Sequence, residues 1–120
     1  MQTANKNFQV SIDVRQNVVI LVLEGFLDDK SGEEINALVQ EKMDAKFTRY
    51  VFDFAKVRNI CSPAVATLLD LSEKITDQLS GRIYMSGLSE LNHKIFEMVG
   101  IFLFAEGCHT LQEAEVKATM

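Results

Sequence analysis

The residues of this sequence that could do chemistry stand together in the stretch Asn59-Ile60-Cys61-Ser62-Pro63, where a thiol and a hydroxyl precede the only proline. A cysteine close to a helix N-terminus can have a lowered pKa and act as a nucleophile. A serine there can accept a hydrogen bond from a free backbone N–H of the first turn, and proline is best tolerated at the first helical position. We therefore expect a helix that begins here, with Ser62 as its N-cap and Pro63 as its first residue.

Catalysis by Cys61 is the weaker interpretation of this stretch. No second cysteine stands near it to resolve an oxidised thiol, and no histidine or aspartate partner is evident in the sequence. The other cysteine, Cys108, is distant, so the two thiols fit neither a disulfide framework nor a zinc pattern. We expect Cys61 to be a small, inert and partly buried side chain.

The remaining polar residues form no recognisable catalytic or metal-binding motif. His93 and His109 are the two histidines, the HExxH pattern is absent, and no glycine array has the spacing of a phosphate-binding loop. The acid pairs at 28–29 and 33–34 are typical of helix starts, where carboxylates interact favourably with the helix dipole. The sequence thus predicts a protein that is not an enzyme and that uses no metal or cofactor.

Composition predicts one folded domain. The chain has 120 residues, of which 48% are hydrophobic and 24% charged, and its formal net charge is −5. These values favour a packed core, which we expect to span residues 8–116 of a single domain over 1–120. Scattered basic residues argue against nucleic acid or membrane as partners. Neither a signal-peptide pattern nor a membrane-length apolar run is present, so we expect a cytoplasmic protein.

The hydrophobic period alternates between that of strands and that of helices. Strand patterns cover residues 8–14, 18–25, 50–57, 82–87 and 101–107. Helix patterns follow Ser31, follow Ser62, and cover residues 88–100 and 109–120. Ser31 and Glu34 have the spacing of a capping box, and Gly81 and Gly100 stand where helices should stop.

The helix patterns also predict which side chains face the core. In the helix after Ser62 these are Val65, Leu68, Leu69, Ile75 and Leu79, and in the helix over 88–100 they are Leu91, Ile95, Met98 and Val99. Strands that alternate with helices indicate an α/β fold. We expect a mixed sheet of about five strands with about four helices packed against it, and functional loops along one edge of that sheet.

Four segments together resemble the STAS domain, the fold shared by bacterial anti-sigma-factor antagonists and the cytoplasmic tails of sulfate transporters. The resemblance extends over nearly the whole chain, from about residue 8 to 116. It is carried by Gly25-Phe26-Leu27-Asp28, by Tyr50-Val51-Phe52-Asp53-Phe54, by Asn59-Ile60-Cys61-Ser62-Pro63-Ala64-Val65, and by Phe96-Glu97-Met98-Val99-Gly100-Ile101 with Phe104 and the final Leu111-Gln112-Glu113-Ala114.

The resemblance implies a protein partner and a switch. Antagonists of this family bind a serine-kinase anti-sigma factor through the loop after the third strand and the following helix, and the kinase inactivates them by phosphorylating that loop. Aligned without gaps, the phosphoacceptor of the family falls on Pro63, which has no hydroxyl. The usual switch is therefore not expected in this chain, and Ser62 is the alternative site of phosphorylation.

The expected function is that of a non-enzymatic protein-binding regulatory module in a bacterial pathway. A signalling scaffold, a subunit of a membrane transporter complex and a small-ligand carrier remain as alternatives, and the oligomeric state, monomer or homodimer, stays open. By resemblance and by sheet topology the contact surface should include the exposed side of the helix as far as Asp70. Its expected core residues are Asp28, Asn59, Cys61, Ser62, Pro63, Ala64, Gly87 and Ser89.

Overall fold

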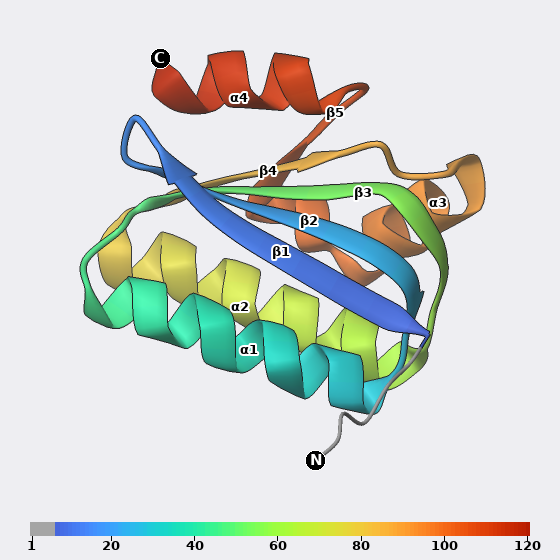
Figure 1. The fold of residues 1–120 in the computed structure, drawn as a ribbon. Coiled ribbons are helices and arrows are strands. Elements are labelled where there is room, and N and C mark those ends of the chain that lie inside the picture. Colours follow the sequence, from blue (N-terminus) through green and yellow to red (C-terminus); the bar gives the residue numbers. More distant parts are fainter. Residues whose placement is uncertain (1–6) are drawn as a thin grey trace.

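The computed structural model describes residues 7–120, which form a five-stranded mixed sheet in the order β1-β2-β3-β4-β5 (Figure 1). β1 is antiparallel to β2, and the other pairs are parallel. The strands are β1 (Phe8–Arg15), β2 (Val18–Leu27), β3 (Arg49–Ile60), β4 (Arg82–Ser86) and β5 (Ala105–Cys108). The predicted α/β fold with a mixed sheet is confirmed.

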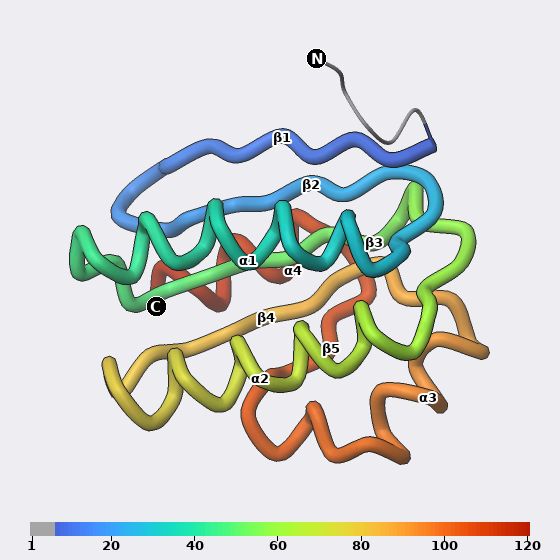
Figure 2. Tube along the Cα trace, turned by 90° about the horizontal axis from the view of Figure 1, so that it is seen from below, coloured from blue at the N-terminus to red at the C-terminus, as the bar shows by residue number. Residues whose placement is uncertain are grey.

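Three helices and one short 3-10 turn lie between these strands, and a fourth helix follows β5. They are α1 (Asp29–Asp44), α2 (Ser62–Leu79), α3 (Glu90–Val99), the 3-10 turn η1 (Ile101–Leu103) and α4 (Leu111–Thr119). α1 and α2 cover one face of the sheet and α4 covers the other (Figure 1). α3 lies on the same side as α1 and α2, beside α2 (Figure 2). None of the helices described here is long and apolar enough to cross a membrane.

Each face of the sheet has its own apolar core. The larger core lies between the sheet and α1, α2 and α3, where Phe52, Phe54, Leu68 and Phe96 are almost completely buried. The smaller core lies under α4; its main members are Val18, Ile20, Val51, Tyr84 and Ala114. Because both faces of the central strands are covered, β2 and β3 need the nearly continuous apolar runs that the sequence shows.

The first helix begins earlier than the capping-box prediction placed it. Asp28 is the N-cap of α1, and its carboxylate accepts hydrogen bonds from the Ser31 backbone N–H and hydroxyl, each at 2.9 Å. Ser31 is buried within the first turn instead of preceding it. The prediction was wrong because Asp and Ser are both good N-caps, and β2 delivers an extended Asp28 to the helix start.

The end of α2 also differs by one residue. Ser80, with φ of 51°, takes the left-handed C-cap conformation that Gly81 was expected to take. Gly81 is needed for a different reason. A Cβ at this position would stand 2.5 Å from Ile75 Cγ2 and 2.6 Å from the carbonyl oxygen of Thr48. The glycine therefore allows the chain to turn closely over the end of α2 into β4.

The buried face of α3 is only partly the predicted one, since Ile95 alone of the four predicted core residues packs against the larger core. Leu91, Met98 and Val99 are 66%, 84% and 41% exposed, whereas Asn92 and Phe96 are buried. Phe96 packs edge-on against Phe54, with ring centroids 5.5 Å apart. One deeply inserted aromatic ring therefore sets the rotation of this helix, and the apolar stripe is turned toward solvent.

The predicted strand over 101–107 is wrong in its first half. Gly100, with φ of 90°, ends α3, and the chain then forms η1 before it enters β5 at Ala105. Ile101 is buried in the larger core, while Leu103 is 83% exposed. A short apolar run without a clear period does not distinguish such a turn from a strand.

Candidate functional site

Two helix N-termini lie side by side where β2 and β3 end. These parallel strands finish on the same pair, Leu27 opposite Ile60, and the Cys61 N–H donates to the Leu27 carbonyl oxygen at 2.8 Å. Asp28 follows Leu27 and Cys61 follows Ile60, and these two residues are the N-caps of α1 and α2. The topology thus brings together two segments that are distant in the sequence.

A close contact between α1 and α2 keeps these N-termini together. A Cβ at Gly32 would lie 3.3 Å from Thr67 Oγ1 and 3.5 Å from Ala64 Cα, so the helices approach closely at this point. Ala64 is completely buried there. It belongs to the helix contact and presents no surface to a partner, in contrast to its neighbours at 62 and 63, which are exposed.

The capping arrangement predicted for Ser62 and Pro63 is wrong by one residue. Cys61 is the N-cap of α2, with φ of −78° and ψ of 162°, and makes no side-chain capping bond. Ser62 and Pro63 are the first two helical residues, and both are exposed. The reason lies in β3, which continues to Ile60, so that the chain leaves the sheet at Cys61. The Ser62 hydroxyl is therefore not used as the cap.

Asn59 stands in a strand, although a loop was expected here. It is opposite Phe26 near the end of β3 and is exposed. The β2–β3 register shifts between Val22 and Glu24 and again between Gly25 and Phe26. These irregularities lie near the ends of the two strands. Asn59 therefore lies at the same end of the sheet as Asp28.

The turn after β4 completes this end of the sheet. Gly87, with φ of 72°, packs so closely on β3 that a Cβ would stand 2.8 Å from the Ala55 nitrogen. Ser89 caps α3 by accepting a hydrogen bond from the Asn92 N–H at 3.1 Å. We call the surface formed by Asp28, Asn59, residues 61–63 and residues 87–89 the rim.

A buried polar pair supports the rim from inside the sheet. The Ser86 hydroxyl donates to Asp53 Oδ1 at 2.9 Å, and the two residues are 0% and 6% exposed. Because Asp53 and Ser86 are the last register pair of β3 and β4, this bond fixes where the 87–89 turn leaves the sheet. Buried polar groups with satisfied hydrogen bonds favour one register over its alternatives.

The titratable groups near the rim have structural partners. Hydrogen bonds from the Ser31 backbone and side chain lower the pKa of Asp28 below its usual value. Burial raises the pKa of the Cys108 thiol, and both cysteines are free. His93 stacks on Phe102 with ring centroids 4.8 Å apart, and His109 lies 3.8 Å from a carboxylate oxygen of Glu113. Within residues 7–120, no group of His, Cys, Asp and Glu is arranged to hold a metal ion.

A family model for the STAS domain matches residues 9–114, which include every segment of the rim. The chain belongs to the STAS domain family. This STAS chain matches none of the curated proteins.

Solved structures share the fold at low identity. An anti-sigma factor antagonist from Mycobacterium paratuberculosis has a TM-score of 0.82 at 13% identity, covering 99% of this chain and 100% of that one. The phosphorylated form of the Bacillus cell fate determinant SpoIIAA has a TM-score of 0.72 at 22% identity, covering 92% and 97%. A STAS domain protein from Planctomyces limnophilus has a TM-score of 0.74 at 16% identity, covering 91% and 96%.

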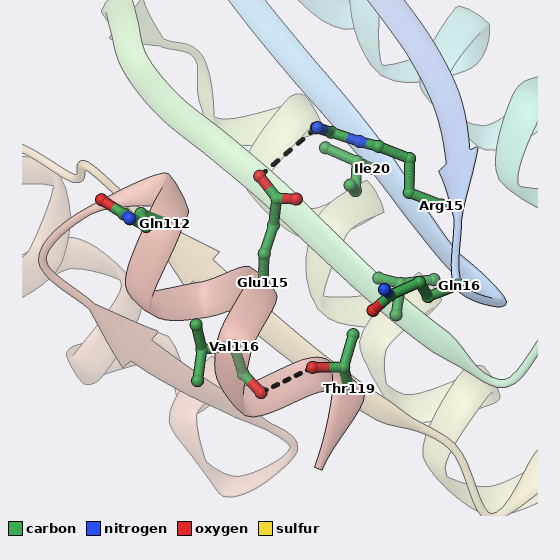
Figure 3. Close-up of a pocket in the computed structure, with 8 residues that line it drawn as sticks. Arg15, Gln16, Ile20, Gln112, Glu115, Val116 and Thr119 are labelled. Carbon is green, nitrogen blue, oxygen red and sulfur yellow. Dashed lines mark hydrogen bonds and ion pairs between the residues drawn. The ribbon is translucent and has the colours of Figure 1, made fainter.

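A groove that sequence reasoning did not find lies between α4 and the β1–β2 hairpin, away from the rim (Figure 3). Its volume is about 540 Å³, and buried Val18 and Ile20 lie at its floor. Arg15 and Glu115 reach toward each other across it, with 3.3 Å between Nη2 and Oε2 (Figure 3). Only the position of the terminal helix over the hairpin creates this groove, and no local pattern in the sequence predicts that position.

Proposed function

We propose that this STAS domain is a non-enzymatic protein-binding module that regulates a bacterial signalling pathway by occupying a protein partner through the rim. The observation that carries the proposal is the side-by-side arrangement of the α1 and α2 N-termini, held by the bond between Cys61 and Leu27. Asn59, Ser62 and Pro63 are exposed beside these helix ends, and we propose that they lie at the centre of the contact surface. Such a surface can place a few anchor residues inside a polar border, as protein interfaces require.

The proposed partner is a serine-kinase anti-sigma factor or a related signalling protein. One of the similar structures described above is named an anti-sigma factor antagonist, and another is named an anti-sigma-factor antagonist (STAS) domain protein. In the proposed mechanism the module competes for this partner and thereby releases another client. The mechanism needs binding only, so no side chain has to act as a nucleophile or as a general acid.

The module is proposed to lack the loop phosphorylation switch. Pro63 stands where the family resemblance puts the phosphoacceptor, and it has no hydroxyl. The competing site is Ser62, which is exposed and is not the helix cap. A phosphate on Ser62 would lie at a helix N-terminus, where its charge is favourable, so phosphorylation there would not unfold α2.

The binding part of the proposal is tested with purified proteins. Affinity for a serine-kinase anti-sigma factor of the source bacterium is measured by titration calorimetry for the wild type, Asn59→Lys and Ser62→Glu. Asp77→Lys is the control, since Asp77 is also exposed but lies near the far end of α2. We expect the two rim variants to bind at least about tenfold more weakly and the control to bind like the wild type. Equal affinity of all four proteins would contradict the rim as the contact surface.

The switch is tested by incubating the same kinase and ATP with the wild type and with Pro63→Ser, followed by peptide mapping. We expect no phosphate on the wild type and a phosphate on the serine introduced at position 63. A phosphate on Ser62 of the wild type would overturn the constitutive mechanism and would assign the switch to that residue.

The groove under α4 supports a second candidate, a carrier of a small ligand. Its apolar floor and its mouth, bridged by Arg15 and Glu115, would suit an amphipathic molecule. Native mass spectrometry of the purified protein tests this role directly. A bound small molecule that is lost in a Val116→Lys variant would support it, since Val116 lines the groove and is 57% exposed.

A further inference from the structure

The outer edge of β1 is an unpaired strand edge. All eight residues of β1 pair with β2 on one side, and in the described part of the chain no strand pairs with the other side. α1 runs beneath β2 and β3 and leaves β1 at the border of the molecule (Figure 2). Natural proteins usually shorten, charge or cover such edges, because an open edge is a template for another strand.

The hairpin geometry determines which backbone groups point outward. Gln16 and Asn17, with φ of 52° and 66°, form a two-residue turn, so its flanking residues Arg15 and Val18 form a hydrogen-bonded pair. Hydrogen-bonded and non-hydrogen-bonded pairs then alternate along the hairpin. The backbone groups of the odd-numbered residues of β1 therefore bond to β2. The bond from the Phe26 N–H to the Asn7 carbonyl oxygen, 2.9 Å long, fits this alternation. The backbone groups of Phe8, Val10, Ile12 and Val14 therefore face away from β2.

The side chains along this edge are only partly covered. Val10 and Ile12 are half-buried against the larger core, and Val14 is 36% exposed. On the opposite face of the strand, Gln9, Ser11 and Asp13 are exposed. The edge thus has an apolar side and a polar side, and both continue to the border of the molecule.

We propose that two copies of this chain associate through the outer edges of β1, antiparallel about a twofold axis at Ser11. This register places Val10 opposite Ile12 of the second copy and Phe8 opposite Val14 of the second copy. All four of these residues carry outward-facing backbone groups, so about eight hydrogen bonds can form across the axis. The two sheets would join into one sheet of ten strands, with the apolar sides on the same face.

On the polar side of β1 this register brings complementary groups of the two copies together, which favours a second copy as the occupant. With the axis at Ser11, the amide of Gln9 faces the carboxylate of Asp13 of the second copy, and the two Asp13 residues stay apart. An axis at Asp13 would set the two carboxylates directly opposite each other, which is destabilising. With the axis at Ser11, the outward backbone groups of Val10 and Phe8 meet those of Ile12 and Val14 of the second copy, so every outward group of β1 has a partner.

The dimer is expected to be weak and to depend on salt. A single strand pair buries less than the roughly 800 Å² per partner of a standard stable interface. Each copy also has a formal net charge of −5, so the two copies repel each other until salt screens them. We expect dimerisation at micromolar to millimolar concentration, with an affinity that rises with salt.

The test uses the intact chain with cysteine cross-linking. Ser11→Cys should form a disulfide-linked dimer under mild oxidation, because the axis puts the two introduced thiols in directly opposed positions. Asp13→Cys is the matched control and should cross-link much less, since its sulfur would face Gln9 of the second copy. The wild type reports any cross-linking by Cys61 and Cys108 themselves.

Sedimentation equilibrium supplies the second measurement. Ser11→Lys puts two like charges opposite each other and should weaken the dimer roughly tenfold, whereas Ser11→Thr should keep it. A wild type that stays monomeric at millimolar concentration in high salt, or equal cross-linking of the two cysteine variants, would overturn the proposal. Ser62→Glu on the rim should leave the dimer unchanged, so this inference stands or fails separately from the proposed partner binding.

Discussion

The backbone N–H of Cys61 donates a 2.8 Å hydrogen bond to the carbonyl oxygen of Leu27. This bond joins the last residue of β2 to the N-cap of α2, and the residue after Leu27 is the N-cap of α1. The two helices therefore start from one point of the sheet. In the binding that we propose, a partner on the rim would contact two rigid helix ends instead of two independent loops, which would reduce the conformational entropy lost on binding.

Asp28→Asn should lower stability at neutral pH and flatten its pH dependence in acid. The folded-state pKa of Asp28 lies below its ordinary value of 3.8, so its stabilising effect is complete above that value and is lost as the pH falls through the folded-state pKa. The wild type and the variant should converge at low pH. Urea unfolding between pH 2 and pH 7 would measure this, with Asp77→Asn as control; parallel curves would contradict it.

Gly25→Ala should cost far more stability than Gly100→Ala. Both glycines have positive φ, 99° and 90°, so backbone strain of about 1–2 kcal/mol applies to each. At Gly25 a Cβ would stand 1.9 Å from the Asn7 carbonyl oxygen, whereas at Gly100 its nearest contact is a Leu103 methyl at 3.6 Å. We expect a further loss on the order of 2 kcal/mol or more at Gly25. Equal unfolding free energies for the two variants would refute the steric argument.

Tyr50→Phe should remove part of the alkaline sensitivity of the fold. Burial raises the pKa of Tyr50 to about 12, and its hydroxyl donates to the Phe47 carbonyl oxygen at 2.9 Å. The contribution of this phenol is complete below the unfolded-state value of 10.0 and is lost as the pH rises toward the folded-state value. The variant should lose about 1 kcal/mol at pH 7 and show a shallower decline between pH 10 and pH 12. Thermal unfolding measured across this range checks both effects, and an unchanged decline would count against the argument.

Substitutions on α3 should show that its buried Phe96 ring contributes strongly to stability and that its exposed apolar side chains do not. Met98→Gln and Leu91→Gln should each change stability by no more than about 0.5 kcal/mol, because these side chains are 84% and 66% exposed. Phe96→Ala should cost about 3–5 kcal/mol, because the ring is completely buried against Phe54. Denaturant titration of the three variants gives the comparison. A large loss at Met98 would mean that α3 is rotated as its apolar stripe predicts.

Much of the fold could be predicted because its local signals agree with its topology. The β-branched run from Val18 is long enough for a central strand, and the polar Gln16-Asn17 pair marks the turn of the hairpin. The parallel strands then follow from the helices between them. α3 could not be predicted in the same way, since helical spacing identifies an apolar stripe but not the element that covers it. In this structure Phe96 packs against Phe54, whereas Leu91 and Met98 are exposed.

The meeting of the candidate site's segments at one end of the sheet could be predicted, but the residues that cap its helices could not. Parallel topology predicts that the segments after β2, β3 and β4 meet at one end of the sheet, as Asp28, Cys61 and Gly87 do. The identity of the caps depends on where the strand ladder stops. Because β3 stays paired as far as Ile60, Cys61 takes the position expected of Ser62. The range of a β-ladder is a tertiary property, and residue preferences at single positions do not reveal it.

The strand order of this sheet has a consequence for how the protein is made. Since the spatial order β1-β2-β3-β4-β5 repeats the order of synthesis, every new strand joins the edge left by the one before it. A chain that leaves the ribosome N-terminus first can assemble by simple addition, and no strand has to insert between two that are already paired. The hairpin can serve as the first template, and each connecting helix can pack on the strands already made before the next strand is synthesised. Folding during translation is thus compatible with this topology from the first forty residues onward, roughly the length that includes β1, β2 and most of α1.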